Sequence, residues 1–430
     1  MSYYKRTADA LLQDLLDAFG AVLIEGPKWC GKTTTASQVA NSILKMQDPS
    51  MRAEYLATAK TKPSILLNGA TPRLIDEWQD APTLWDAVRT TVDDRQIPGQ
   101  FILTGSNTVD KSQIHHSGAG RIARLRMLPM SLWESQESTG EVSLKELFNN
   151  PDYDIDGKMS KMTVEDLIFA ASRGGWPASL LARTPKAQLL VAKNYVQTIC
   201  SNDISGIDGK KRDARLTSMI LRAYARNVST LVKKKSLLDD VTSSGEVSCH
   251  VDTFDDYVAA LEKLFVIQNI SAWCPAIRSK TAIRSSVKRC FCDPSIPIAL
   301  LGLSPESLSM QLRTFGFIFE QMCIRDLKAY TIDLNSHVSY YHDRYDLEAD
   351  IVLHLEDGRY ALIECKLGSS EIDEGSKHLL ELKRLIQEHN KTEKQVPIRE
   401  PDLLIVMTGG TMAYTRPDGV KVIPLACLKD

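Results

Sequence analysis

One stretch near the N-terminus constrains the fold more than any other part of the sequence. An apolar run at residues 21–24 leads into a loop with glycines at 26 and 31, and a helical pattern follows from Thr34 to about Leu44. The two glycines let the backbone turn so that successive N–H groups point inward. The positive N-terminal end of the following helix adds to that field. Strand, loop and helix in this order predict a P-loop within an α/β fold.

The residue types of this loop indicate its ligand. Lys32 can reach the β- and γ-phosphates of a nucleotide, and the Thr33 hydroxyl can ligate Mg²⁺. We therefore expect ATP and Mg²⁺ as cofactors. The predicted nucleotide-binding residues are Gly26, Pro27, Lys28, Trp29, Cys30, Gly31, Lys32, Thr33 and Thr34.

Composition sets broad limits. A chain of 430 residues is long enough for two or three domains, and its net charge of -2 gives no overall attraction to nucleic acid. No apolar run approaches the roughly 20 residues of a membrane helix, and the N-terminus lacks the apolar segment of a signal peptide. Nine scattered cysteines without a CxxC pair predict reduced thiols and no structural zinc. We expect a cytoplasmic, multidomain protein that does not enter the membrane.

Two adjacent carboxylates follow the P-loop at the end of a predicted strand. The pattern predicts a second strand at Ser64–Asn68 and a third at residues 73–77, which ends in Asp76 and Glu77. Asp76 is placed to hold Mg²⁺ through water, and Glu77 to orient and deprotonate the attacking water. A solvated strand end is the alternative.

Two further strands carry candidate phosphate-contacting residues. Residues 100–107 form an apolar strand that ends in small polar residues. In AAA+-type ATPases such a residue touches the attacking water or the γ-phosphate, so Ser106 and Asn107 are candidates, with Thr104 a weaker one; a simple turn is the alternative. Residues 120–129 form the next strand, and Arg121 at its start is the candidate phosphate-sensing arginine or finger offered to a neighbouring subunit.

These motifs together resemble a known family. The sequence contains GPKWCGKTTTA, PRLIDEWQ, FILTGS and GRIARLRMLPMS, in this order. They resemble bacterial and archaeal AAA+-type ATPases with a C-terminal domain of unknown function, and the resemblance covers nearly the whole chain. It implies Mg-ATP hydrolysis and a homo-oligomer such as a ring. It also implies an AAA+-type core at 1–140 and a helical lid at 141–208.

The middle section, 209–275, has the pattern of a winged helix. Helices are expected at Leu216–Val228, Lys235–Val241 and Thr253–Val266. Acidic residues on the third helix argue against reading of bases, so any DNA contact here would be with the phosphate backbone, made by the earlier basic helix. Protein packing is the alternative role. The basic residues are Lys210, Lys211, Arg212, Arg215, Arg222, Arg226, Lys233, Lys234 and Lys235, and the linker at 273–289 is basic too.

The last section, 276–430, carries a second set of carboxylates. Residues 348–355 and 360–367 form a predicted hairpin, in which alternation places Glu364 and Lys366 on one face with Asp350 on the partner strand. Two carboxylates beside a lysine suit a second divalent metal, Mg²⁺ or Mn²⁺, and activation of water for phosphodiester attack. Glu320, on an upstream helix, is a candidate third carboxylate.

This arrangement is similar to the PD-(D/E)XK nuclease superfamily. A helix at Ser376–His389 and strands at 401–407 and 420–424 would complete a mixed sheet. The resemblance implies metal-dependent DNA cleavage, although domains of this fold also hold DNA or partners without cutting.

Together these features predict an α/β multidomain ATPase that binds and remodels or translocates duplex or branched DNA, chiefly through its phosphate backbone, with coupled nuclease activity as an option. The alternative is an ATP-gated switch that captures a protein partner and has a silent nuclease-like domain. DNA-stimulated ATP hydrolysis that falls steeply with salt would favour the first.

Overall fold

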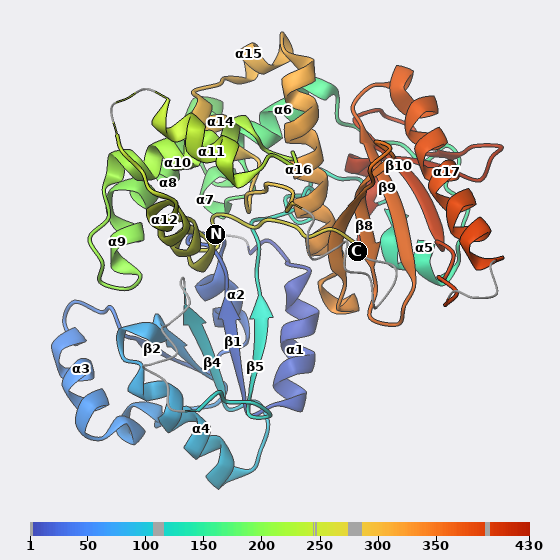
Figure 1. Ribbon diagram of the computed structural model, residues 1–430. Coiled ribbons are helices and arrows are strands. Elements are labelled where there is room, and N and C mark those ends of the chain that lie inside the picture. Colours follow the sequence, from blue (N-terminus) through green and yellow to red (C-terminus); the bar gives the residue numbers. More distant parts are fainter. Residues whose placement is uncertain (1–2, 106–115, 244, 246, 274–285, 392–395) are drawn as a thin grey trace.

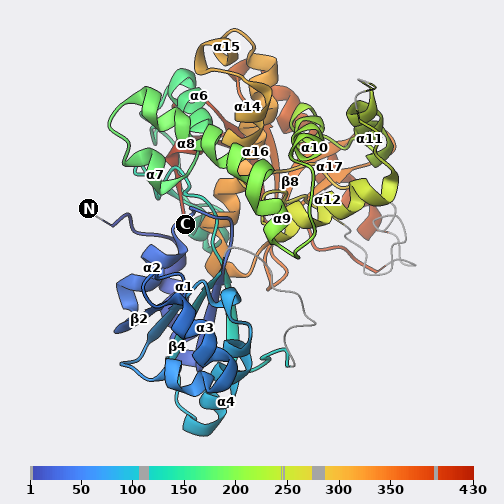
Figure 2. The ribbon, with the colours of Figure 1, turned by 90° about the vertical axis from the view of Figure 1, so that its left-hand side faces the viewer.

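The computed structural model describes residues 3–105, 116–243, 245, 247–273, 286–391 and 396–430. An N-terminal sheet domain, a helical middle and a second sheet domain follow one another along the chain (Figure 1). In the view turned by 90° about the vertical axis, the N-terminal sheet domain projects below the other two (Figure 2). Within the described ranges, no helix is both long and apolar enough to cross a membrane, and the eight described cysteines are free thiols.

The N-terminal domain is built on a five-stranded parallel sheet in the order β2-β3-β4-β1-β5. Its strands are β1 (Ala21–Glu25), β2 (Ser42–Lys45), β3 (Arg73–Asp76), β4 (Phe101–Gly105) and β5 (Ile122–Arg126). Its helices are α1 (Ala8–Ala18), α2 (Lys32–Val39), α3 (Arg52–Thr61), η1 (Pro63–Leu67), η2 (Trp78–Asp80) and α4 (Thr83–Arg95). Separate apolar clusters cover the two faces of the sheet, as a parallel sheet requires. This confirms the predicted α/β P-loop core.

One strand of this sheet was predicted in the wrong place. The expected strand at Ser64–Asn68 is instead the 3₁₀ helix η1. Pro63 fixes φ and lacks an N–H, which favours a helical turn, and Leu66 and Leu67 then bury against the core. The second strand is β2, within the segment expected to continue the helix after the P-loop. Its burial alternates because it is an edge strand, paired only with β3.

The predicted helical lid, 141–208, divides between two neighbours. Its first part pairs with the end of the chain, because β6 runs parallel to β13 and Arg359 donates to the carbonyl of Phe148 at 2.6 Å. Its later part, α7 and α8, lies over the P-loop. These elements are β6 (Val142–Ser143), α5 (Leu144–Asn149), α6 (Val164–Arg173), α7 (Pro177–Leu180), α8 (Pro185–Thr198), η4 (Ile199–Asp203), α9 (Ile204–Gly206) and β13 (Leu428–Lys429).

Three helices form the middle unit where the sequence predicts them. They are α10 (Ala214–Arg226), α11 (Lys234–Thr242) and α12 (Val251–Lys263). After α12 the chain forms antiparallel bridges between Ile267 and Phe291 and between Ile270 and Lys288. The Trp273 N–H then donates to the carbonyl of Tyr340 at 2.6 Å, which attaches this segment to the C-terminal sheet. Short helices α14 (Ser295–Leu301) and α15 (Pro305–Ser309) lead to the last domain.

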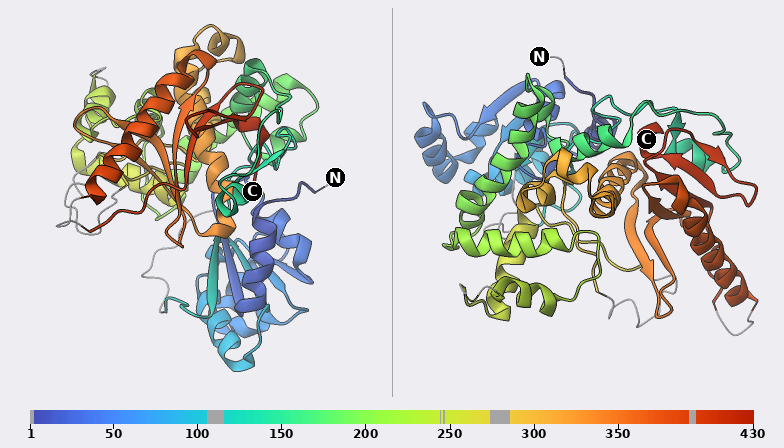
Figure 3. Two further views of the ribbon diagram at one scale, coloured as in Figure 1. Left: turned by 90° about the vertical axis from the view of Figure 1, so that its right-hand side faces the viewer. Right: turned by 90° about the horizontal axis from the view of Figure 1, so that it is seen from above.

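The C-terminal domain is a six-stranded mixed sheet in the order β11-β12-β10-β9-β8-β7. Its strands are β7 (His337–His342), β8 (Glu348–His354), β9 (Tyr360–Lys366), β10 (Leu403–Thr408), β11 (Tyr414–Thr415) and β12 (Lys421–Pro424). Its helices are α16 (Leu312–Tyr330), η5 (Ile332–Leu334), η6 (Ser369–Glu371), α17 (Ile372–Asn390) and η7 (Leu425–Cys427). Helices α16 and α17 cover opposite faces of the sheet (Figure 3). The predicted hairpin is confirmed, since β8 pairs antiparallel with β9; β7 was not predicted.

Candidate functional site

The P-loop connects the end of β1 to the start of α2. Its backbone takes left-handed angles at three positions, with φ of 152° at Gly26, 65° at Trp29 and 104° at Gly31. A Cβ atom at Gly26 would lie 2.2 Å from the carbonyl oxygen of Met127, so this position requires glycine. The loop therefore curls as a phosphate cradle does, with the α2 N-terminus at its base.

The predicted nucleotide-contacting side chains meet at the mouth of this loop. The Lys32 ammonium, 5% exposed, donates to the carbonyls of Gly26 and Pro27, each at 2.9 Å. The Thr33 hydroxyl donates to Asp76 Oδ1 at 2.7 Å, and the Thr104 hydroxyl donates to the same oxygen at 2.7 Å. A hydroxyl beside a carboxylate at a phosphate cradle offers the hard oxygen ligands that Mg²⁺ prefers, so these residues fit Mg-ATP.

Glu77 lies next to this group. The residue adopts left-handed angles (φ 55°, ψ 48°), which turn the chain away from β3, and its carboxylate accepts a hydrogen bond from the amide of Gln79. Glu77 lines the same cleft as Lys32 and Thr33. The other two candidates at the end of β4, Ser106 and Asn107, lie outside the described residues.

A cleft of about 1040 Å³ opens over the P-loop, large enough for a nucleotide. Its far wall comes from α7 and α8, the later part of the predicted lid. Trp29, 41% exposed, lines it and stacks edge-to-face on Tyr195 with 5.5 Å between ring centroids. Lys28 forms an ion pair at 2.6 Å with Asp203 of η4, which follows α8. Other lining residues from α7, α8 and the turns that flank them are Pro177, Ala178, Leu181, Leu190, Val191, Lys193, Asn194 and Gln197.

The structure does not bring Arg121 to the P-loop of its own chain. The parallel register places Ile122 beside Ala21, so Arg121 lies at the amino ends of the strands, whereas the P-loop follows their carboxyl ends. Four residue steps separate these ends by roughly 13 Å. The Arg121 guanidinium instead pairs with Asp93 at 2.7 Å. A sensing role within one chain is therefore excluded, and the finger toward a neighbouring subunit stays a prediction.

A buried ion pair behind the P-loop was not foreseen from the sequence. Arg6 donates to Glu134 at 2.9 Å, to the carbonyl of Cys30 at 2.8 Å and to that of Leu128 at 2.7 Å. Burial alone would raise the pKa of Glu134, but the charge and hydrogen bonds of Arg6 lower it below its usual value. The pair fixes the loop from behind. The two residues lie too far apart in sequence for any local pattern to join them.

The second candidate site is a group of carboxylates on β8 and β9. One oxygen each from Glu348, Asp350 and Glu364 lie within 4.8 Å of one another. The Cys365 N–H donates to Asp350 at 2.9 Å, which fixes that carboxylate. Glu348 was not predicted as a member of this group, although it stands two residues before Asp350 and strand alternation puts both on one face.

The Glu364 carboxylate lacks adequate partners. It is fully buried, and among the described residues neither of its oxygens accepts a well-aligned hydrogen bond. The Lys366 ammonium stands 3.0 Å away as an ion-pair partner. Burial raises the pKa of Glu364. A buried carboxylate with unsatisfied oxygens beside two other acids fits a divalent cation with oxygen ligands.

Glu320 does not join these three carboxylates. Lys288, from the segment after α12, donates to Glu320 and also to the Asp350 carbonyl at 3.0 Å. Both side chains of the pair are buried. Burial alone would lower the pKa of Lys288, but Glu320 and Asp350 raise it well above its usual range. Glu320 thus anchors a lysine at the edge of the site, and its predicted place as third carboxylate belongs to Glu348.

Family models match three consecutive parts of the chain. A model of an AAA domain matches residues 18–136. Models of two domains of unknown function, DUF8612 and DUF4143, match residues 164–307 and 315–428. The AAA match spans the P-loop, Asp76, Glu77 and β5.

Individual proteins are similar at low identity. The uncharacterized proteins Mb2031c of Mycobacterium bovis and Rv2008c of Mycobacterium tuberculosis are each 24% identical over 368 residues, 83% of this chain and 72% of the relative. The Walker-type ATPase PABY2304 of Pyrococcus abyssi is 12% identical, with a TM-score of 0.42 over 70% of this chain and 96% of that chain. A DNA replication initiation factor is 12% identical, with a TM-score of 0.27 over 59% of this chain and 85% of that chain.

The AAA match agrees with the geometry of the first site. The parallel sheet, the cradle between β1 and α2, and the contact of Thr33 with Asp76 are features of P-loop nucleoside triphosphate hydrolases. The N-terminal part of this chain is a P-loop ATPase of the AAA type, and the protein is an ATP-hydrolysing enzyme.

Proposed function

We propose that this ATPase acts on DNA and that its C-terminal domain is a metal-dependent nuclease of the PD-(D/E)XK kind. The observation that carries the proposal is the group of Glu348, Asp350 and Glu364 beside Lys366. The order of elements supports it, because α16, β7, β8, β9, α17 and β10 surround these acids as one helix-flanked sheet.

In the proposed ATPase reaction, each residue at the mouth of the P-loop has a role. Lys32 and the loop amides hold the phosphates, while Thr33 and Asp76 hold Mg²⁺. Glu77 orients the attacking water and accepts its proton. Trp29 and the α7–α8 wall enclose the base and sugar, so closure of that wall would exclude bulk solvent while the attacking water stays bound at Glu77. Arg121 is proposed as a finger for a neighbouring subunit of a homo-oligomer.

The nuclease half uses oxygen ligands from both strands of the hairpin. Glu348, Asp350 and Glu364 would hold a Mg²⁺ or Mn²⁺ ion, which supplies a nucleophilic hydroxide when bound. Lys366 would contact the scissile phosphate or orient the water. Lys288 holds Glu320 and the Asp350 backbone, so its part is to position the strand that carries a ligand.

The three-helix unit, 209–275, supports a winged helix in its order of elements, since antiparallel bridges follow α12. Four of the nine basic residues at 210–235, however, are paired with carboxylates within the unit, namely Lys210, Arg212, Arg226 and Lys234. Lys210 and Arg212 contact Asp256 at 2.7 and 2.9 Å, and Lys234 contacts Asp255 at 2.9 Å. Such pairs leave less charge for phosphate, which favours a packing role for this unit. A packing role for this unit supports a second candidate function, an ATP-gated switch that captures a protein partner.

A cleavage assay separates the two candidates. Linear, single-stranded and four-way-branched DNA would be incubated with the protein, ATP and Mn²⁺, and Asp350→Ala compared with the wild type. Asp357→Ala is the matched control, because it removes a carboxylate from the turn of the same hairpin. Cleavage lost in Asp350→Ala and kept in Asp357→Ala is expected. Wild-type protein that cuts none of the three substrates would show that the domain is not a nuclease.

A further inference from the structure

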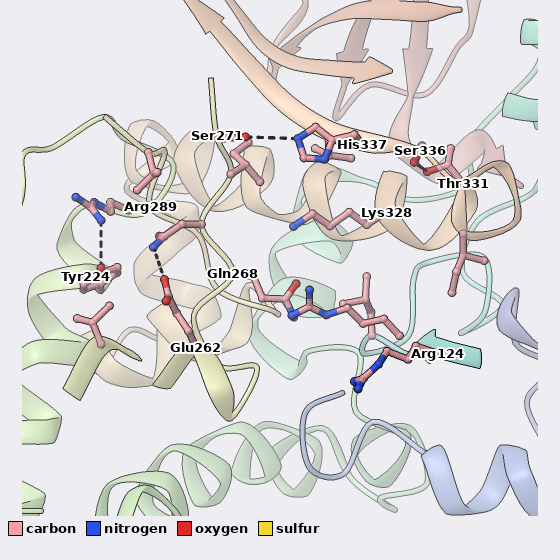
Figure 4. A pocket seen from close by; sticks show the side chains of 18 of the residues that line it. Arg124, Tyr224, Glu262, Gln268, Ser271, Arg289, Lys328, Thr331, Ser336 and His337 are labelled. Carbon is pink, nitrogen blue, oxygen red and sulfur yellow. Dashed lines mark hydrogen bonds between the residues drawn. The ribbon is translucent and has the colours of Figure 1, made fainter. Parts of the chain in front are cut away.

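A second cleft, distinct from both sites, lies where three parts of the chain meet. It has a volume of about 750 Å³. One wall comes from β5 of the ATPase sheet, another from α12 and the segment that follows it, and the third from the end of α16 and the start of β7. Figure 4 shows side chains from these elements converging on one opening.

The walls of the cleft carry an excess of positive charge. Among the described residues, five arginine and lysine side chains and two carboxylates line it. The cations are Arg124, Arg126, Lys234, Arg289 and Lys328, and the carboxylates are Asp255 and Glu262. On a chain with an overall net charge of -2, this excess is local.

Some of these charges are already paired. Arg124 contacts Glu25 at 3.1 Å, and Lys234 contacts Asp255 at 2.9 Å. Glu262 accepts a hydrogen bond from Asn269 at 3.2 Å. These contacts account for both carboxylates on the walls.

Two of the remaining cations, Lys328 and Arg126, form no ion pair with a carboxylate among the residues that the structure describes. Arg126 lies over the Phe265 ring at 4.9 Å. Arg289 is already held in place, because it donates to the Tyr224 hydroxyl at 3.2 Å and to the Val232 carbonyl at 3.2 and 3.3 Å. The charge of Glu262 also acts on Arg289. Burial lowers the pKa of Lys328, as expected for an ammonium without a counter-charge. Figure 4 shows the Lys328 side chain extending into the opening.

We propose that this cleft binds a small ligand with at least two phosphate groups. Lys328 on α16 and Arg126 on β5 can each hold a phosphate by charge-assisted hydrogen bonds, and Arg289 adds positive charge on the wall between them. Thr331, Ser336 and Gln268 line the same space and can complete the contacts. The volume lies in the range of small-molecule sites.

A nucleic acid strand fits the cleft less well. Single strands bind by stacking successive bases on aromatic faces. The lining aromatics Tyr224 and Phe254 are each 1% exposed and offer no such face.

The position of the cleft gives its ligand a structural consequence. Arg124 pairs with Glu25, the residue directly before the P-loop glycine Gly26. Lys328 stands on α16, the helix that also carries Glu320 beside the carboxylate site. A bound polyanion would therefore join the ATPase sheet to the C-terminal domain.

Binding of inorganic pyrophosphate tests the site. Radiolabelled pyrophosphate would be measured by equilibrium dialysis on the full chain with Lys32→Ala, which removes the P-loop lysine as a competing anion site. We expect one bound pyrophosphate per chain. Adding Lys328→Gln or Arg126→Gln should weaken its binding about tenfold or more, because each removes a charged hydrogen-bond donor. Adding Lys60→Gln, an exposed lysine on α3, is the matched control and should leave it unchanged.

Three results would overturn the proposal. One is no binding at millimolar pyrophosphate, and another is equal weakening by the Lys60→Gln control. The third uses a short single-stranded oligonucleotide as competitor. In that result, the oligonucleotide displaces pyrophosphate when its concentration, counted in phosphate groups, is far below that of pyrophosphate. If Lys328→Gln also weakens oligonucleotide binding as much as pyrophosphate binding, the cleft is a nucleic-acid site. Thermal unfolding of each variant checks that a loss of binding is not a loss of fold.

Discussion

At the scale of single residues, the candidate nucleotide site combines side chains placed by strand ends with buried ion pairs that support them. Lys32, Thr33 and Asp76 follow strand ends in a recognisable order, because their chemistry depends on local backbone shape and on where a strand stops. The Arg6–Glu134 and Lys288–Glu320 pairs join residues far apart in sequence, so only the fold brings them together. Strand alternation places Glu348 on the same face as Asp350, so Glu348 could have been predicted from the sequence as well.

The buried pair behind the P-loop predicts a specific dependence on pH. Glu134→Gln leaves Arg6 buried without its counter-charge and should destabilise the protein by about 3–5 kcal/mol at neutral pH. The folded-state pKa of Glu134 is lowered, so the stability from its charge is present above the unfolded value of about 4.3 and disappears as pH falls through the lower folded value. Denaturant unfolding at several pH values should show the wild-type advantage constant near neutrality and shrinking below about pH 4.3. A difference that stays constant down to pH 3 would contradict the charged pair.

The carboxylate group predicts a response to metal. Mn²⁺ should raise the melting temperature of the wild type, since a ligand that binds only the folded state stabilises it. In Glu348→Gln the Mn²⁺ concentration needed for the same shift should rise about tenfold or more, because ligand charge sets affinity. The metal-free variant should be no less stable than the wild type, since one repulsive charge is gone. Asp357→Asn serves as control, and an equal loss in that variant would refute the assignment of Glu348.

At the scale of elements, amphipathic helices were the most predictable part. Helices α10, α11, α12 and α17 begin and end near their expected limits, because a sustained apolar face of helical period needs no tertiary information. The short apolar runs at 42–45 and 64–67 were assigned wrongly, the first to a helix and the second to a strand, whereas they form strand β2 and 3₁₀ helix η1. Four residues fit an edge strand or a 3₁₀ turn equally well. Pro63 was the available signal for the turn.

Two glycines, Gly175 in the turn between α6 and α7 and Gly316 within α16, give opposite predictions. A Cβ at Gly175 would lie 2.2 Å from the Met130 carbonyl oxygen and 2.6 Å from its nitrogen, so Gly175→Ala must separate two backbone segments. We expect a loss of about 1–3 kcal/mol or more in the free energy of unfolding. Gly316, within α16, has open space around its Cβ position, so Gly316→Ala should gain up to about 1 kcal/mol. Chemical denaturation of both variants checks the pair, and equal effects of the same sign would contradict the described packing.

At the scale of the whole molecule, the domains are interlocked beyond what domain boundaries in a sequence suggest. Strand β6 pairs with β13 near the end of the chain, and Ser138 donates to the Leu428 carbonyl at 2.6 Å. Leu132 N–H donates to Asp326 of α16 at 3.0 Å. The segment after β5 therefore connects the ATPase sheet to the carboxylate-bearing domain. Such long-range pairing leaves no local pattern.

ATP turnover in the presence and absence of duplex DNA, at low and raised salt, tests the central claim most directly. We expect DNA to stimulate ATP hydrolysis by the wild type and by Asp350→Ala, and raised salt to remove that stimulation. We expect Glu77→Gln to hydrolyse no ATP with or without DNA, at either salt concentration. The salt effect follows from phosphate contacts. Turnover that ignores DNA at every salt concentration, with Glu77→Gln inactive as expected, would contradict the DNA-coupled account and leave an ATP-gated protein switch.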